Sequence, residues 1–209
     1  MGVDDFNLNG RGDLLWQHRT TGQLALWVLT GTQLTIETGV ASGTHSAWRV
    51  AATGDVNGDG HADIVWQHPA TGLTKVWLMW YWAVVMETGL TPYQADVNWR
   101  IAGAADFNGD NRDDLVWHHR QTGQITIWHM GADGRTATST GTVSSTSVTP
   151  GWLIRAVGDF NRNGTPDLVW HHALTGQLSI WFLNGTTVVG QQPLVPAQID
   201  PAWSIASGW

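Results

Sequence analysis

The stretch DVNGDGHADIVWQH, residues 55–68, occurs four times along this chain with small changes. The other copies are DFNLNGRGDLLWQH from Asp5, DFNGDNRDDLVWHH from Asp106 and DFNRNGTPDLVWHH from Asp159, so that successive copies start 50, 51 and 53 residues apart. Each copy passes from a polar, glycine-bearing loop into a β-branched and aromatic run. A repeat of this length, rich in short apolar runs, is typical of a propeller or another closed array.

Each repeat contains the pattern of four short strands. In the second repeat the expected strands cover 48–55, 64–68, 73–79 and 81–87, with turn residues between them. No segment has a sustained 3.6-residue apolar period, so no helix is expected. Several strands are apolar on both faces, which stacking between neighbouring sheets explains. The sequence predicts an all-β, single-domain β-propeller over 1–209, with repeats at approximately 1–47, 48–98, 99–151 and 152–200.

The two ends of the chain suggest how the ring closes. The first repeat shows no strand ahead of Asp5, whereas segment 201–209 (PAWSIASGW) begins like a fifth copy and stops where its Asp would stand. We therefore expect 201–209 to complete the first blade, which would pair two strand edges that otherwise invite aggregation. The same arithmetic permits closure between chains, in a homo-oligomeric ring with more than four blades.

Composition excludes several classes of partner. Charged residues make up 13% of the 209 residues and the net charge is -7, so a basic surface for nucleic acid is not expected. No apolar run approaches the roughly 18 residues of a membrane span, so no membrane insertion is expected. The chain has no cysteine, which excludes disulfides and thiolate metal sites. The N-terminal MGVDDF is not a signal peptide, so secretion would need a signal absent from this chain.

The DFNGDG-x-x-DLVW core with a downstream TG-x-x-x-IW element resembles the FG-GAP/VCBS repeat family. That family includes the integrin α-subunit propeller, bacterial and fungal propeller lectins, and domains attached to secreted enzymes. The resemblance covers essentially the whole chain and implies a propeller that works outside the cell. Four repeats are fewer than propellers of that family usually have.

The polar loop of each copy places side-chain oxygens at its first, third, fifth and ninth positions. These candidate metal ligands are Asp5, Asn7, Asn9, Asp13, Asp55, Asn57, Asp59, Asp63, Asp106, Asn108, Asp110, Asp114, Asp159, Asn161, Asn163 and Asp167. Alternating oxygens with a sharp turn at the sixth position suit Ca²⁺. Loops 55–63 and 106–114, with three candidate carboxylates each, are the best candidates, and the resemblance implies a structural calcium there. The alternative is an Asx-turn, in which Asp and Asn bind the amides of their own loop. No organic cofactor is expected.

Twelve of the 15 tryptophans recur in register, one on each of three strands in every repeat. The set before the loop is Trp48, Trp99, Trp152 and Trp203. The set on the strand after the loop is Trp16, Trp66, Trp117 and Trp170, and the set on the third strand is Trp27, Trp77, Trp128 and Trp181. Large aromatic wedges that fill the gaps between blades explain most of them, because each buries roughly 150–250 Å².

A histidine follows each Trp of the second set by two residues and so lies on the same face of the strand. These are His18, His68, His119 and His172. Adjacent histidines on a strand diverge, which excludes a zinc site. Aromatic walls with few polar groups suit sugar rings, and the pattern is similar to that of propeller lectins with sites between blades. The candidate ligand-binding residues are Trp16, His18, Trp27, Trp66, His68, Trp77, Trp117, His119, Trp128, Trp170, His172 and Trp181. The alternative is that each His caps the Thr-Gly turn that follows it.

The sequence therefore predicts a non-enzymatic, carbohydrate-binding protein with repeated and multivalent glycan sites. No catalytic motif and no set of catalytic residues that occurs only once is present, so an enzyme is not expected. The first alternative is a calcium-stabilised protein-binding module of the integrin-propeller type. The second is a structural propeller that forms part of a larger secreted protein.

Overall fold

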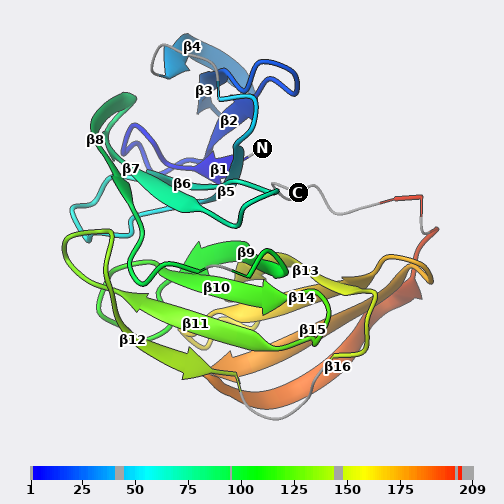
Figure 1. The fold of residues 1–209 in the computed structure, drawn as a ribbon. Helices are drawn as coiled ribbons and strands as arrows, with labels where there is room; N and C mark the ends of the chain where they lie inside the picture. The colour runs from blue at the N-terminus through cyan, green and yellow to red at the C-terminus, as the bar shows by residue number, and fades with distance from the viewer. Residues whose placement is uncertain (1, 41–44, 95, 144–147, 201, 204–209) are drawn as a thin grey trace.

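The computed structural model describes residues 2–40, 45–94, 96–143, 148–200 and 202–203. Within these residues the chain forms sixteen strands and no helix, which confirms the all-β prediction. The strands form four antiparallel sheets of four strands each, which we call blades 1 to 4 (Figure 1). No helix that could cross a membrane occurs in the part of the chain that is described.

Every blade is a meander in which consecutive strands are neighbours. Blade 1 contains β1 (Gly2–Asp4), β2 (Asp13–Gln17), β3 (Leu24–Thr30) and β4 (Gln33–Val40). Blade 2 contains β5 (Arg49–Gly54), β6 (Asp63–Gln67), β7 (Thr74–Trp80) and β8 (Ala83–Gly89). Blade 3 contains β9 (Trp99–Ala105), β10 (Asp114–His119), β11 (Ile125–Met130) and β12 (Ala137–Thr142). Blade 4 contains β13 (Trp152–Gly158), β14 (Asp167–His172), β15 (Gln177–Asn184) and β16 (Thr187–Gln198).

Neighbouring blades stack face to face through their apolar side chains. One core joins Leu26 of blade 1 to Trp66 of blade 2, and a second joins Val76 of blade 2 to Trp117 of blade 3. A third core joins blades 3 and 4 in the same way. Strands β6 and β10 are buried along their whole length, because each is covered by a blade on both faces.

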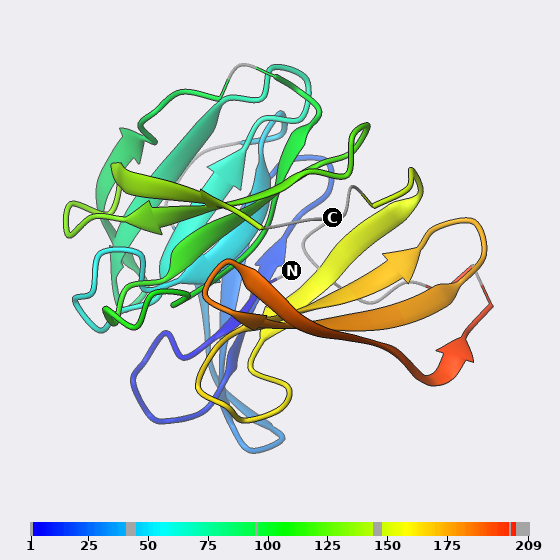
Figure 2. The same ribbon diagram turned by 90° about the horizontal axis from the view of Figure 1, so that it is seen from below.

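The inner strands β1, β5, β9 and β13 line one central cavity of about 190 Å³. Figure 2 shows the blades spreading outward from these strands. The lining is mostly Ala, Gly and Val, because the inner strands approach closely; a Cβ on Gly103 would lie 2.7 Å from Cγ2 of Val157. Since all four inner strands border one cavity, a single chain forms the four-bladed propeller.

The prediction for the start of blade 1 was wrong. A short inner strand, β1, precedes Asp5 and pairs with β2, with Gly2 opposite Leu15. Only three residues are needed, because an antiparallel pair can extend directly from Asp4 opposite Asp13. The predicted closing strand over 201–209 lies outside the described residues, apart from the exposed Ala202 and Trp203.

Candidate functional site

A pair of tryptophans crosses the second and third strands of every blade. The ring centroids of each pair are between 4.6 and 4.9 Å apart. The pairs are Trp16 with Trp27, Trp66 with Trp77, Trp117 with Trp128, and Trp170 with Trp181. In blade 2, Trp66 faces Lys75 and Trp77 faces Ile64, so that the two rings are diagonal neighbours on one face of the blade. The repeated sequence pattern therefore builds the same aromatic wall in each blade.

Most of these walls serve as wedges between blades, as their size suggests. Trp66, Trp117 and Trp170 are at most 1% exposed. Among the described residues, however, the indole Nε1 atoms of these three and of Trp16 are buried without a hydrogen-bond partner. Buried polar groups are nearly always hydrogen bonded. Each of these indoles therefore keeps a donor for a water molecule or a ligand.

In blade 4 the tryptophan pair borders an open cavity. Its volume is about 210 Å³, and its lining residues are Val148, Trp152, Trp170, Ser179, Trp181 and Gln191. A second cavity of about 380 Å³ also touches Trp152, Ser179 and Gln191, and extends along Gln177 and Gln192. The two cavities together form a cleft with indole walls and a rim of neutral amide and hydroxyl groups.

In blade 2 the corresponding space is filled by the side chain of Lys75. Its ammonium lies 4.9 Å from the ring centroid of Trp48, 5.6 Å from that of Trp66 and 5.2 Å from that of Trp77. The carboxylate of Glu87 holds it in place, with Lys75 Nζ 3.0 Å from Glu87 Oε1. Glu87 also accepts the indole N–H of Trp77 at 2.5 Å. Burial raises the pKa of Glu87, but the hydrogen bonds from Lys75 and Trp77 outweigh it and lower the pKa overall.

Two positions therefore distinguish the four walls, and neither lies in the repeated motif. The residue opposite the second-strand Trp is Ala25, Lys75, Thr126 or Ser179 in blades 1 to 4. The residue opposite the third-strand Trp is Glu37, Glu87, Thr140 or Gln191. The repeated motif predicts neither these residues nor the part that Trp152 plays in the cavity. These positions could have been found in the sequence by looking for residues that differ between otherwise similar repeats.

Three of the four repeated histidines contact the turn that follows them. The backbone N–H groups of Thr21, Thr122 and Thr175 donate to Nδ1 of His18, His119 and His172 at 3.1, 3.1 and 3.2 Å. These three histidines therefore cap the Thr-Gly turn, as the alternative interpretation expected. In the second blade, the carbonyl oxygen of His68 accepts the amide of Gly72 at 2.9 Å.

Three of the repeated histidines, His68, His119 and His172, pack against tryptophans at the start of the inner strands. The ring of His119 meets Trp99 nearly at right angles with centroids 5.0 Å apart, and the pairs of Trp48 with His68 and Trp152 with His172 are similar. Because Nδ1 of His119 accepts a backbone N–H, its Nε2 carries the proton and donates to Asp96 at 2.9 Å. These interactions hold the turn against its blade.

The first aspartate of each acidic loop binds the amides of its own loop. In loop 55–63, Oδ1 of Asp55 accepts the N–H of Asp59 at 3.1 Å and Oδ2 accepts that of Gly60 at 2.7 Å. The same two contacts occur from Asp5, Asp106 and Asp159. The residue at the third position of the loop also accepts a loop amide, because Asn57 Oδ1 accepts the N–H of Asp59 at 2.9 Å. This is the Asx-turn geometry.

The last aspartate of each loop is fully buried and joins the loop to the third strand. The members of this set are Asp13, Asp63, Asp114 and Asp167, all 0% exposed. Oδ2 of Asp63 accepts the N–H of Val56 at 3.2 Å, and Oδ1 accepts that of Met79 at 2.9 Å. Burial raises the pKa of Asp63 to about 8.

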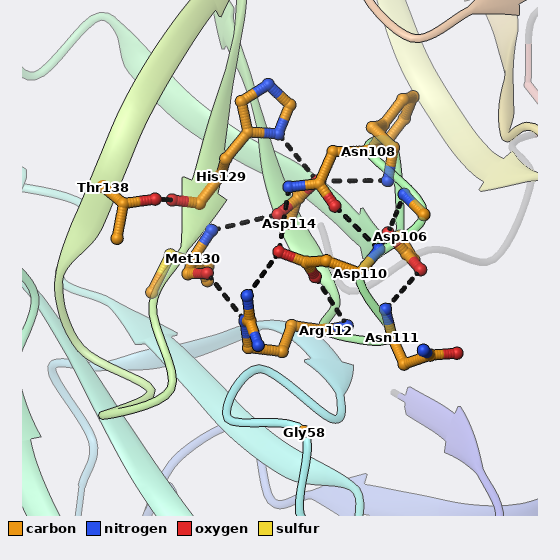
Figure 3. Close-up of polar contacts among 12 residues, drawn as sticks. Gly58, Asp106, Asn108, Asp110, Asn111, Arg112, Asp114, His129, Met130 and Thr138 are labelled. Carbon is orange, nitrogen blue, oxygen red and sulfur yellow. Dashed lines mark hydrogen bonds and ion pairs between the residues drawn. The ribbon is translucent and has the colours of Figure 1, made fainter.

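In loop 106–114 the positively charged side chain of Arg112 lies beside the loop carboxylates (Figure 3). The guanidinium of Arg112 binds Asp110 Oδ2 at 2.5 Å and donates to the carbonyl of Met130 at 3.1 Å. The ring of His129 contacts the buried Asp114 through Nδ1 at 2.8 Å. Among the described residues, no three His, Asp or Glu side chains are grouped to hold a metal ion. The loops form the Asx-turns of the alternative interpretation, and a calcium site in them stays a prediction from the sequence.

Two carboxylates that the repeat does not share lie where blades 1, 2 and 3 meet. Asp113 accepts the N–H of Asp55 at 3.0 Å, and its own N–H donates to the carbonyl of Asp55 at 2.8 Å. Burial, together with the charge of Asp4, raises the pKa of Asp113 to about 7. Burial raises the pKa of Asp4 as well. These carboxylates link neighbouring blades at the cost of a buried charge.

Comparison with family models identifies a repeat family in this chain. The sequence model of the FG-GAP-like repeat matches residues 5–66 and 106–170. No curated protein matches the chain. A chain of the Tc holotoxin pore of Photorhabdus luminescens, in a mutant form, is 17% identical with a TM-score of 0.49, over 88% of this chain and 9% of that chain. The repeat matches cover more than half of the sequence, and the protein belongs to the FG-GAP-like repeat family.

Proposed function

We propose that the protein is a non-enzymatic carbohydrate-binding propeller and that the cleft of blade 4 is its principal sugar site. The observation that carries the proposal is the cavity between Trp152, Trp170 and Trp181, with Ser179 and Gln191 at its side. Apolar walls with a few polar groups are the usual composition of small-ligand sites. The cavity volume of about 210 Å³ is below the roughly 300–1,000 Å³ of pockets for drug-sized molecules, and so suits a single sugar ring.

The polar groups of the cleft match what a neutral sugar needs. Its C–H face can pack on an indole, and its hydroxyls can bond to the amide of Gln191. The hydroxyl of Ser179 donates to the carbonyl of Gln192 at 3.1 Å, so its oxygen keeps lone pairs for a ligand hydroxyl. None of the six lining residues ionises near neutral pH. The cleft therefore offers no general acid or base, which supports binding rather than catalysis.

The walls of the four blades are not equivalent, which changes the expected multivalency. Lys75 fills the wall of blade 2, and Thr126 stands at its position in blade 3. We therefore propose one open sugar cleft in blade 4 rather than four equal sites. Any avidity would then require several copies of the chain on one glycan surface.

A glycan array followed by tryptophan fluorescence titration tests the proposal. We expect neutral glycans to bind and to shift the emission of the indoles that line the cleft. Ser179→Lys should place an ammonium over the tryptophan pair, as Lys75 does in blade 2, and weaken sugar binding at least tenfold. The matched control is Ala25→Lys, the same change at the same register of blade 1, which should leave sugar binding unchanged. An array without any bound glycan would overturn the proposal.

A second candidate function, a protein-binding adhesion module, is favoured by one surface. The hairpin that joins β7 to β8 exposes Trp80 by 55%, Val85 by 62% and Met86 by 51%, with Trp82 beside them. Exposed apolar patches of this kind mark protein contacts. Replacing Trp82 and Met86 by Ser removes this surface and leaves the cleft of blade 4 intact. Loss of cell adhesion in that variant, with glycan binding absent from the parent, would favour the second candidate.

A further inference from the structure

In blade 2 the aromatic wall holds a cation, and this cation is the ammonium group of Lys75. The ammonium of Lys75 lies within 4.9–5.6 Å of three indole centroids and 3.0 Å from Glu87 Oε1, and Lys75 is 8% exposed. An ammonium over indole faces is attracted by the ring quadrupole, and the attraction grows when water is excluded. The wall of blade 2 therefore shows how this arrangement of Trp and Glu holds an alkylammonium.

Blade 1 has the same tryptophan pair and a glutamate in the same register, with an alanine in place of the lysine. Trp16 faces Ala25 across β2 and β3, as Trp66 faces Lys75 across β6 and β7. Trp27 faces Glu37 across β3 and β4, in the register that places Trp77 opposite Glu87 in blade 2. The two indole pairs also match in geometry, with centroids 4.9 Å apart at 54° in blade 1 and 4.7 Å at 63° in blade 2.

The two walls differ in how deeply they are buried. Trp66 and Trp77 are 0% and 2% exposed, because the core between blades 1 and 2, His45 and Lys75 cover them. Trp16 and Trp27 are only partly buried, and Glu37 is exposed, as Glu87 is. Across the described residues, Trp16 Nε1 is buried without a hydrogen-bond partner. With Ala25 in place of a lysine, the pair of Trp16 and Trp27 and the carboxylate of Glu37 have no internal cation between them and can hold an external one.

We propose that blade 1 binds an organic ammonium ion at Trp16, Trp27 and Glu37, in the place that Lys75 occupies in blade 2. The other two blades do not have this combination, because Thr140 and Gln191 replace the carboxylate in blades 3 and 4. The net charge of -7 favours the approach of a cation. The site differs from the neutral cleft of blade 4 in both its position and its ligand chemistry.

An alkyl-linked primary ammonium occurs on lysine side chains and on amino sugars, and both present the group that Lys75 presents. The first probe is n-butylammonium, which copies the end of a lysine side chain, with n-butanol as its uncharged counterpart. Nα-acetyl-lysine amide and glucosamine then distinguish the two sources by which of them binds more tightly. Binding is followed by tryptophan fluorescence and by ligand-detected NMR at constant ionic strength.

We expect saturable binding of n-butylammonium and at least tenfold weaker binding of n-butanol. Glu37→Gln removes an exposed carboxylate without disturbing the core and should weaken n-butylammonium about tenfold. The matched control, Glu87→Gln, makes the same change in blade 2, where Lys75 already fills the wall, and should leave binding at blade 1 unchanged. Ala25→Lys should abolish it by supplying an internal cation, and Lys75→Ala should open a second site.

The same variants keep this inference separate from the sugar proposal. Ala25→Lys should abolish ammonium binding and spare sugar binding, whereas Ser179→Lys should do the reverse. Failure of the glycan array therefore leaves the ammonium site standing. Equal binding of n-butanol and n-butylammonium, or binding of n-butylammonium that both Glu37→Gln and Ala25→Lys leave unchanged, would overturn the ammonium site.

Discussion

The Nζ atom of Lys75 lies 3.0 Å from Oε1 of Glu87, above a tryptophan pair that recurs in every blade. In blade 4, Ser179 and Gln191 stand at the positions of these two residues, and a cavity borders the corresponding pair. The same tryptophan pair is thus covered by the ammonium of Lys75 in blade 2 and borders an open cavity in blade 4. The identity of two side chains outside the repeated motif makes the difference.

The charge of Lys75 should contribute to the stability of blade 2. Lys75→Met keeps an unbranched apolar side chain and removes the ammonium, and should lower the free energy of unfolding by about 1–2 kcal/mol, because a desolvated cation–π contact contributes that much. The melting temperature should then fall by roughly 2–4 °C per kcal/mol for a chain of this size. Urea denaturation of both proteins measures the change. Equal midpoints would show that only the apolar stem of Lys75 matters.

The capping histidines should affect stability and not sugar binding. His119→Ala removes the acceptor for Thr122 N–H, the hydrogen bond to Asp96 and the contact with Trp99. We expect a loss of about 1–2 kcal/mol, from two lost hydrogen bonds, one of them to the exposed Asp96, and lost packing, with unchanged affinity at blade 4. Parallel thermal melts and sugar titrations test both parts. Weaker sugar binding at unchanged stability would return this histidine to the ligand site.

Removal of calcium should leave the fold unchanged. Both carboxylate oxygens of Asp55 already accept loop amides, and the carboxylate of Asp63 is buried on two further amides. The loop is therefore closed without a metal ion. Melting with and without a chelator, together with elemental analysis, provides the measurement. A lower melting temperature in chelator would favour calcium in loops 55–63 and 106–114 instead.

The four-bladed fold was predictable because the same loop-and-strand pattern recurs at a nearly constant spacing. The aromatic walls were predictable too, since Trp66 and Trp77 fall in the same register in every repeat. What occupies each wall was not, because it depends on cross-strand neighbours such as Lys75 and Glu87, which the repeated motif does not include. A search for positions at which otherwise equal repeats differ would have found them.

The histidines and the loop carboxylates show a different limit. Strand periodicity correctly places His119 on the same face as Trp117, but the turn that follows brings a free amide, Thr122 N–H, within reach of its ring. Spacing alone likewise gives Asp63 the same weight as Asp55. The structure separates them, because Asp63 begins a buried strand whereas Asp55 is only partly buried. Burial of this kind follows from blade stacking and is not present in the local pattern.

Asp113 should make the protein less stable as the pH rises. Its pKa is about 7 in the folded chain, against an ordinary value of 3.8, because burial and the nearby Asp4 disfavour its charge. The folded state thus holds the proton that the unfolded chain releases above about pH 4. The stabilisation that this bound proton gives is complete below the pKa of Asp113 in the unfolded chain. It is lost as the pH rises towards the pKa of Asp113 in the folded chain, between about pH 4 and 7. The pKa of about 8 for Asp63 acts in the same direction up to that pH.

Asp113→Asn should remove this loss while keeping the bond to the N–H of Asp55, since an amide oxygen can accept it as well. We expect a melting temperature at pH 8 that is about 2–4 °C above that of the parent, the shift for roughly 1 kcal/mol in a chain of this size, and a smaller difference at pH 4. Glu37→Gln, which removes one exposed carboxylate, controls for net charge. If both variants gain equally at pH 8, relief of general charge repulsion explains the gain. A gain confined to Asp113→Asn places the strain at the contact between Asp55 of blade 2 and Asp113 of blade 3.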